Sequence, residues 1–186
     1  MLHHCTSILH SETNRYIQSK IDVKELPVSF AILGNSEAES KFSGGITMRL
    51  VDITSVDLRS NPNEYLPQGD GFVVRKMPEA FSLYFLFSVD YKEFDLLKNL
   101  ELLAYVAAFF QHKSHFDICN TPSLQEVGIE NFSVELVKMS LSERAMLWQT
   151  LGMPYRPSLL YRVGLIFVGD ATLGMKAVST FSSRQN

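Results

Sequence analysis

The sequence has few cysteines, no long apolar run and no signal-peptide pattern at its start. Its two cysteines, Cys5 and Cys119, are too few for a disulfide framework and are typical of a reducing compartment. The most apolar stretch, Leu100 to Phe110, is too short for a bilayer, which takes about 20 apolar residues. We therefore expect a cytoplasmic protein with no membrane insertion.

An excess of positive charge is also lacking, although local basic patches are still compatible with the composition. The formal net charge is −3 at pH 7, which does not favour nucleic acid as a partner because phosphate-binding surfaces need grouped Lys and Arg. With 46% hydrophobic and 20% charged residues in 186, the composition is that of an ordinary folded chain, and this length is typical of one domain.

Motifs of common enzyme classes are incomplete or missing. The stretch GNSEA at Gly34 lacks the second glycine of a nucleophile elbow, and GDGFVV at Gly69 lacks the third glycine of a dinucleotide fingerprint. The chain has no GxxxxGK[ST] and no CxxC. We therefore expect no enzymatic activity, no catalytic residue and no cofactor.

One pair of histidines keeps a metal site open as an alternative. His112 and His115 are three residues apart near the expected end of a helix, so they could share a metal ion. No further ligand is obvious nearby. A solvated pair at a helix C-terminus, where positive charge is favourable, is the preferred interpretation, so we expect no metal.

Apolar periodicity predicts most of the secondary structure. A helical stripe covers residues 2–21, and a capping box of Ser140 and Glu143 begins a short helix that runs to Leu151. Gly152 suits the left-handed position after that helix. The other elements are expected as strands over 28–34, 46–56, 80–90, 132–140 and 158–168 and a long helix over about 92–112.

These elements indicate an α/β (α+β) fold. We expect a mixed or antiparallel sheet of about five strands, with the N-terminal, long and short helices packed on it. Strands 46–56 and 80–90 could pair antiparallel. The prediction is a single domain over residues 1–168, followed by a loose polar tail over 169–186.

Two segments stand out between these elements. Residues 57–78 are rich in turn residues, and a loop that long is expected either to make contacts outside the subunit or to be a plain surface loop. The other segment, LWQTLGMPYRPSLLYRV, is interpreted first as a helix-to-strand corner. There, Trp148, Leu151 and Met153 would pack the short helix on the sheet.

Two long blocks carry a family resemblance. Residues 78–122 combine a strand, a long helix ending in FFQ and a short N-x-P run; residues 134–168 combine L-W-x-x-L-G with Y-x-P-S-x-x-Y-x-V. Together they resemble the N-terminal domain of the cap, or tail-terminator, proteins of phage-tail-like contractile injection systems. The resemblance extends more weakly over nearly the whole chain. It implies a tail-terminator-like fold.

The resemblance also implies structural work. Six subunits would form a homo-oligomeric ring on the end of the inner tube, touch the inner tube protein and the sheath protein of the last layer, and stop polymerisation. We therefore expect the chain to be assembled into the injection particle. The alternatives are an adaptor between tube and baseplate, a small monomeric binding domain, or a metal-dependent enzyme.

A ring needs a patch on each subunit that meets a different patch on the next. The long loop and the stiff corner are the candidate patches, because long loops and Tyr or Arg anchors are common at interfaces. The predicted interface residues are Arg59, Tyr65, Leu66, Arg75, Lys76, Tyr155 and Arg156.

The loop gives the first prediction. Deletion of the middle of residues 57–78 should leave a folded monomer that no longer forms rings, because the deletion removes a subunit contact and leaves the core strands intact. Circular dichroism would check folding, and light scattering would check assembly. Rings that survive the deletion would contradict the interface.

Overall fold

A computed structural model describes residues 2–21, 29–30, 46–56, 63–68, 71–76, 79–89, 96–127, 129–167 and 177–178. The chain groups into two compact units. The first comprises Met1–Thr54 and Ser82–Leu165, and the second comprises Ser55–Phe81 and Ile166–Asn186. That the units act together as the single predicted domain over 1–168 stays a prediction.

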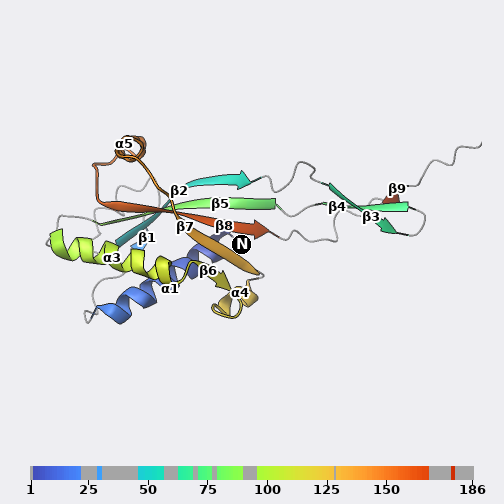
Figure 1. Cartoon of the computed structure of the whole chain (residues 1–186), viewed down its shortest axis with the longest axis horizontal. Helices are drawn as coiled ribbons and strands as arrows, with labels where there is room; N and C mark the ends of the chain where they lie inside the picture. Colours follow the sequence, from blue (N-terminus) through green and yellow to red (C-terminus); the bar gives the residue numbers. More distant parts are fainter. Residues whose placement is uncertain are drawn as a thin grey trace, which may run out of the picture. The chain divides into compact units, whose positions relative to one another are not determined.

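The first unit is built on a six-stranded sheet with the strand order β1-β2-β5-β8-β7-β6 (Figure 1). Strands β2 and β5 are neighbours, as expected for the segments 46–56 and 80–90. The elements of this sheet and its helices are α1 (Leu2–Lys20), β1 (Ser29–Phe30), β2 (Ile46–Val56), β5 (Glu79–Val89), α3 (Leu96–His112), β6 (His115–Asp117), α4 (Ser123–Glu126), β7 (Asn131–Leu136), α5 (Leu141–Thr150) and β8 (Ser158–Phe167).

Strand direction in this sheet is mixed. Among the described residues, strand β1 pairs with β2 in parallel at Thr47 and Met48. Strand β7 is antiparallel to both β6 and β8, and its ladder with β8 runs from Phe132↔Leu165 to Leu136↔Tyr161. The predicted fold class, a mixed sheet with a long helix, an N-terminal helix and a short helix, is confirmed.

Aromatic side chains fill the layer between the sheet and the two long helices. The ring of Phe110 on α3 lies 5.5 Å from Phe87 on β5 and 4.5 Å from Tyr161 on β8. Helix α1 joins this layer through Tyr16, whose ring is 5.2 Å from Phe109. Such ring pairs add stability beyond their buried area, so they hold both helices on this face.

The opposite face of the sheet is covered by α5, which Figure 1 shows on the other side from α1 and α3. Trp148 of α5 is 2% exposed and packs with Leu86 of β5 and Leu160 of β8. Its indole Nε1 donates a hydrogen bond to Ser158 Oγ at 3.3 Å. Leu151 and Met153 pack against the same cluster, so the predicted role of the corner is confirmed.

Both ends of α5 follow the sequence signals. Ser140 Oγ accepts a hydrogen bond from the backbone N–H of Glu143, and the Glu143 carboxylate accepts one from the Ser140 N–H at 2.7 Å. The bond from the Ser140 N–H, together with one from the Ser140 hydroxyl to the same carboxylate, holds the pKa of Glu143 below its usual range. Gly152 has φ +66°, the left-handed conformation that favours glycine and ends the helix.

The second unit contains strands that the sequence analysis did not predict. Residues 57–78 are not a plain loop: strands β3 (Asn63–Gln68) and β4 (Gly71–Lys76) form an antiparallel hairpin with two residues between them. Strand β9 (Ala177–Val178), in the expected loose tail, pairs with β4. The many turn residues in this segment favoured a loop, although its Tyr, Phe and Val residues favour strands.

Strand bounds also differ from expectation. Strand β7 ends at Leu136 rather than at 140, and β6 and α4 were not predicted because each is only three or four residues long. The expected strand 28–34 is described only at Ser29–Phe30. None of the helices in the described ranges is long and apolar enough to cross a membrane.

Trp148 provides a stability test. Trp148→Ala should lower the free energy of unfolding by about 3–5 kcal/mol, because it removes a buried ring and leaves a cavity under α5. Met146→Ala on the same helix is the control, since Met146 is 67% exposed and should cost less than about 0.5 kcal/mol. Urea unfolding would measure both, and equal effects would contradict the packing.

Candidate docking surfaces

The groups that could support catalysis or metal binding are dispersed. In the described ranges, no group of three or more His, Cys, Asp and Glu side chains could hold a metal ion. His115 Nε2 lies 4.0 Å from Asp117 Oδ2, with both side chains exposed. Burial raises the pKa of the Cys5 thiol to about 12, so this thiol is a poor nucleophile at neutral pH.

The corner after α5 presents one of the predicted interface pairs. Tyr155 is 51% exposed, and its ring packs edge-on against buried Trp148 with 6.3 Å between centroids. Arg156 is half-buried. The corner therefore holds an exposed aromatic ring on a rigid base, and the contact of both residues with another subunit stays a prediction.

The hairpin brings together four of the other predicted residues. Tyr65 and Leu66 lie in β3, opposite Val74 and Val73, while Arg75 and Lys76 are in β4. Arg59 lies outside the described residues. A single hairpin thus carries the four, although no observation tests their role at an interface.

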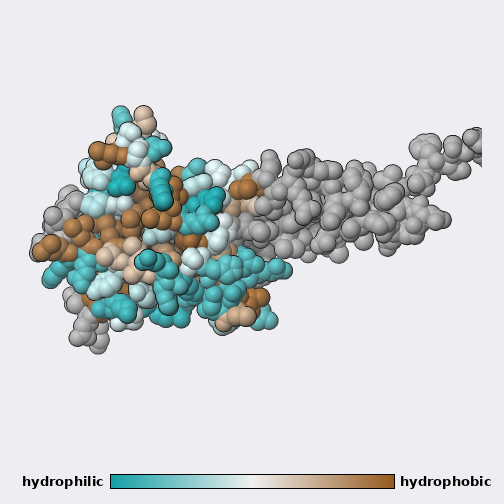
Figure 2. All heavy atoms as spheres, in the orientation of Figure 1, coloured by the Kyte–Doolittle hydropathy of each residue, from teal (hydrophilic) through white to brown (hydrophobic). Residues whose placement is uncertain are grey.

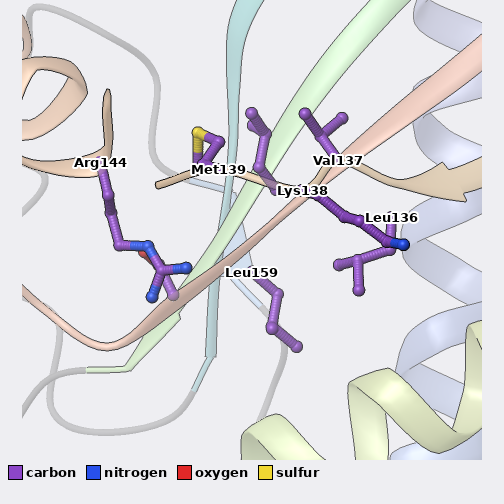
Figure 3. A pocket seen from close by; sticks show the side chains of 8 residues that line it. Leu136, Val137, Lys138, Met139, Arg144 and Leu159 are labelled. Atoms are coloured by element: carbon purple, nitrogen blue, oxygen red, sulfur yellow. The ribbon is translucent and has the colours of Figure 1, made fainter. Parts of the chain in front are cut away.

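A surface that sequence reasoning missed lies where β7 leaves β8. The ladder ends as the Val137 N–H donates to the Leu160 carbonyl at 2.8 Å. Beyond this bond a cavity of about 260 Å³ opens beside β8 (Figure 3). We call it the slot; its lining residues are Leu136, Val137, Lys138, Met139, Arg144, Ser158, Leu159 and Leu160.

The first residues of β8 line the slot from a buried position, since Ser158 is 5% and Leu160 7% exposed. Continuation of the β7–β8 register would place Met139 opposite Ser158. Within the described part of the chain, no backbone hydrogen bond joins these two residues. The first residues of β8 therefore face a cavity where a neighbouring strand would otherwise lie.

The slot is positively charged. Its lining contains Lys138 and Arg144 and no acidic side chain. The Arg144 Nε atom is buried, and no acceptor among the described residues reaches it. Figure 3 shows the Arg144 side chain extending from α5 toward β8. Because a buried donor without an acceptor is costly, the slot is suited to an acceptor from another molecule.

Apolar surface surrounds the slot. Figure 2 shows apolar side chains gathered on the face between α3 and α5. Leu136 beside the slot is 52% exposed, and Leu141 at the start of α5 is 77% exposed. Apolar surface next to charged groups is typical of protein–protein contact sites.

A second missed surface is the outer half of β2. Strand β1 pairs with β2 only at Thr47 and Met48, and no other described strand pairs with that side. Asp52 is exposed and Ile53 is 44% exposed. Asp52 Oδ1 accepts a hydrogen bond from the Ile53 N–H at 2.8 Å, a local bond that protects an open strand edge.

Sequence reasoning missed these surfaces for different reasons. Apolar residues alternate at Phe132, Val134 and Leu136, and the alternation then shifts by one position to Val137 and Met139. The shift coincides with the end of the ladder at Leu136, but periodicity does not show which residues line the space beyond it. An Asp within the strand of residues 46–56 was a usable signal, since charged residues are common on strand edges.

A model of the family described as the Pvc16 N-terminal domain matches residues 4–177. No match is found among curated proteins. The family match runs through both compact units, from α1 to β9.

Two solved structures have a similar fold. One is the sheath/tube terminator of PVC, an extracellular contractile injection system, in the extended state, with a TM-score of 0.57 and 16% identity. The other is the tube-terminating cap of the anti-feeding prophage, with a TM-score of 0.54 and 15% identity. The matches cover 100% and 95% of this chain but only 63% and 60% of those chains.

Arg144 gives a test of the slot. Arg144→Met should leave the free energy of unfolding unchanged or raise it by about 1 kcal/mol, because Met removes a buried donor and retains apolar volume. Thermal or urea unfolding would measure the change. A loss above about 2 kcal/mol would show that Arg144 stabilises the subunit itself and is not free for a partner.

Proposed function

Because the chain belongs to the family of the Pvc16 N-terminal domain, we propose that it is a structural terminator subunit of a contractile injection system. Copies of the chain form a hexameric ring on the end of the inner tube. The ring binds the last sheath layer, ends polymerisation and holds the sheath to the tube end. The protein is not an enzyme in this proposal.

The family match carries the proposal, since it spans nearly every described element. The two similar structures, one a terminator and one a cap, support the same role. Their low identity limits that support to the fold, and fold alone does not establish function. Ring formation and the tube and sheath contacts are therefore parts of the proposal.

The surfaces of the chain support the self-association. A ring that closes requires two different patches on every subunit. The corner with Tyr155 and the slot with its two cations are such patches, and the hairpin with Tyr65 and Arg75 is proposed as a third. A monomeric binding domain or an enzyme would not need this number of docking surfaces.

End-capping is the direct test of this role. Purified chain added to inner tubes of its particle, with and without sheath protein, should produce a ring-shaped density at one tube end and stop tube growth. Electron microscopy and tube-length distributions would measure both. Binding at the baseplate end would favour an adaptor, and absence of binding from both ends would contradict the terminator role.

Mass in solution is a second, simpler measurement. Light scattering across protein concentrations should reveal a species that grows toward six times the monomer mass of 21.1 kDa. Growth to an unlimited size would contradict a closed ring, because a heterologous contact that does not close forms filaments.

A further inference from the structure

We propose that the slot of one copy binds the outer edge of β2 from a second copy, with Asp52 facing the cations Lys138 and Arg144. The inference deepens the proposed function, because it names the surfaces that join neighbouring subunits of the ring. It concerns the first unit alone, which contains both Asp52 and the slot.

Sheet topology makes the contact heterologous. In the strand order β1-β2-β5-β8-β7-β6, the open part of β2 lies toward one end of the sheet. The slot lies on the side of β8 that β7 occupies, toward the other end. Each copy therefore has one donor edge and one acceptor slot, and the contact can repeat from subunit to subunit.

The backbone geometry suits an extended occupant. The slot lies beside Ser158 and Leu159, past the last β7–β8 bond from the Val137 N–H to the Leu160 carbonyl, so an occupant meets its side-chain walls. The outer half of β2 is already extended and exposed in the free subunit. Because it is ordered before binding, its docking costs less conformational entropy than that of a flexible peptide.

The charges of the slot and of the outer edge of β2 are complementary. The slot holds two cations and no carboxylate, while the open edge of β2 carries Asp52 and no cation between Leu50 and Val56. Asp52 Oδ1 is bonded to the Ile53 N–H, and no described residue donates to Oδ2. That oxygen is available to a Lys or Arg of the neighbouring copy, and charge-assisted bonds of this kind are strong.

Apolar contact completes the fit. Ile53 follows Asp52 and is 44% exposed, and the slot walls are mainly aliphatic, from Leu136, Val137 and Leu159. Burial of one Ile side chain contributes to association in proportion to the area removed from water. The pair of Asp52 and Ile53 thus offers a carboxylate to the cations of the slot and an apolar side chain to its aliphatic walls.

The exposed side of α3 fits the slot less well. Leu97 and Leu100 are exposed there, but Lys98 and Glu101 alternate in charge beside them. A surface of mixed sign gains little from a slot with two cations. This side of α3 therefore serves as the control surface.

A charge-reversal cycle tests the contact. The variants are Asp52→Lys, Lys138→Glu, the two combined in one chain, and Glu101→Lys as the control on α3. Sedimentation velocity across concentrations would give the midpoint of self-association, at low salt and at 0.15 M salt, where screening weakens surface pairs.

We expect each single reversal at Asp52 or Lys138 to raise the midpoint concentration at least about tenfold, because like charges then face each other. The midpoint concentration of the combined variant should return to within about threefold of the wild-type value. The midpoint of Glu101→Lys should also stay within about threefold of wild type. Circular dichroism melts check folding. Ile53→Ser, which should weaken association without a charge change, replaces Asp52→Lys if that variant misfolds.

Several outcomes would overturn the inference: a wild-type chain that stays monomeric, a midpoint unchanged by Asp52→Lys, a combined variant that does not recover, or an equal effect of Glu101→Lys. The end-capping assay separates this failure from failure of the terminator role. Capping that does not depend on Asp52 would support the terminator role and contradict the proposed subunit contact. Charge-dependent association without capping would support the subunit contact and contradict the terminator role.

Discussion

The first unit depends on the burial of strand β5 on both of its faces. Phe85 and Phe87 are fully buried, and so is Leu86, whose side chain packs with Trp148 on the side of α5. Covering both faces of a strand requires a packed layer on each side of the sheet, and the strand order places β5 between β2 and β8. This constraint places α1 and α3 on one side and α5 on the other, as Figure 1 shows.

With β5 at the centre, the unpaired strand segments lie toward the two edges of the sheet. The central strands are long, whereas β1, β6 and β7 are short, so parts of β2 and β8 extend beyond their partners. In a monomer such edges are a liability that charged side chains offset. In assemblies such edges can join subunits, and in the proposed contact Asp52 and Arg144 lie at these two places.

Sequence alone predicted what is local. The alternation from Phe81 to Val89, the capping box of Ser140 and Glu143, and Gly152 each identified an element or its end, because the signals lie within one turn or one strand. The hairpin within residues 57–78 was missed because its turn residues outweighed two short strands. The slot could not be predicted, because it depends on where a ladder between distant segments stops.

The division of the chain into two units has a consequence for the order in which the protein folds. The pairing of β3 with β4 joins residues close in sequence, so it closes a small loop and can form early. The pairing of β9 with β4 spans about a hundred residues and must wait for β8 to be made. During synthesis the hairpin therefore emerges as a two-stranded ribbon and gains its third strand last.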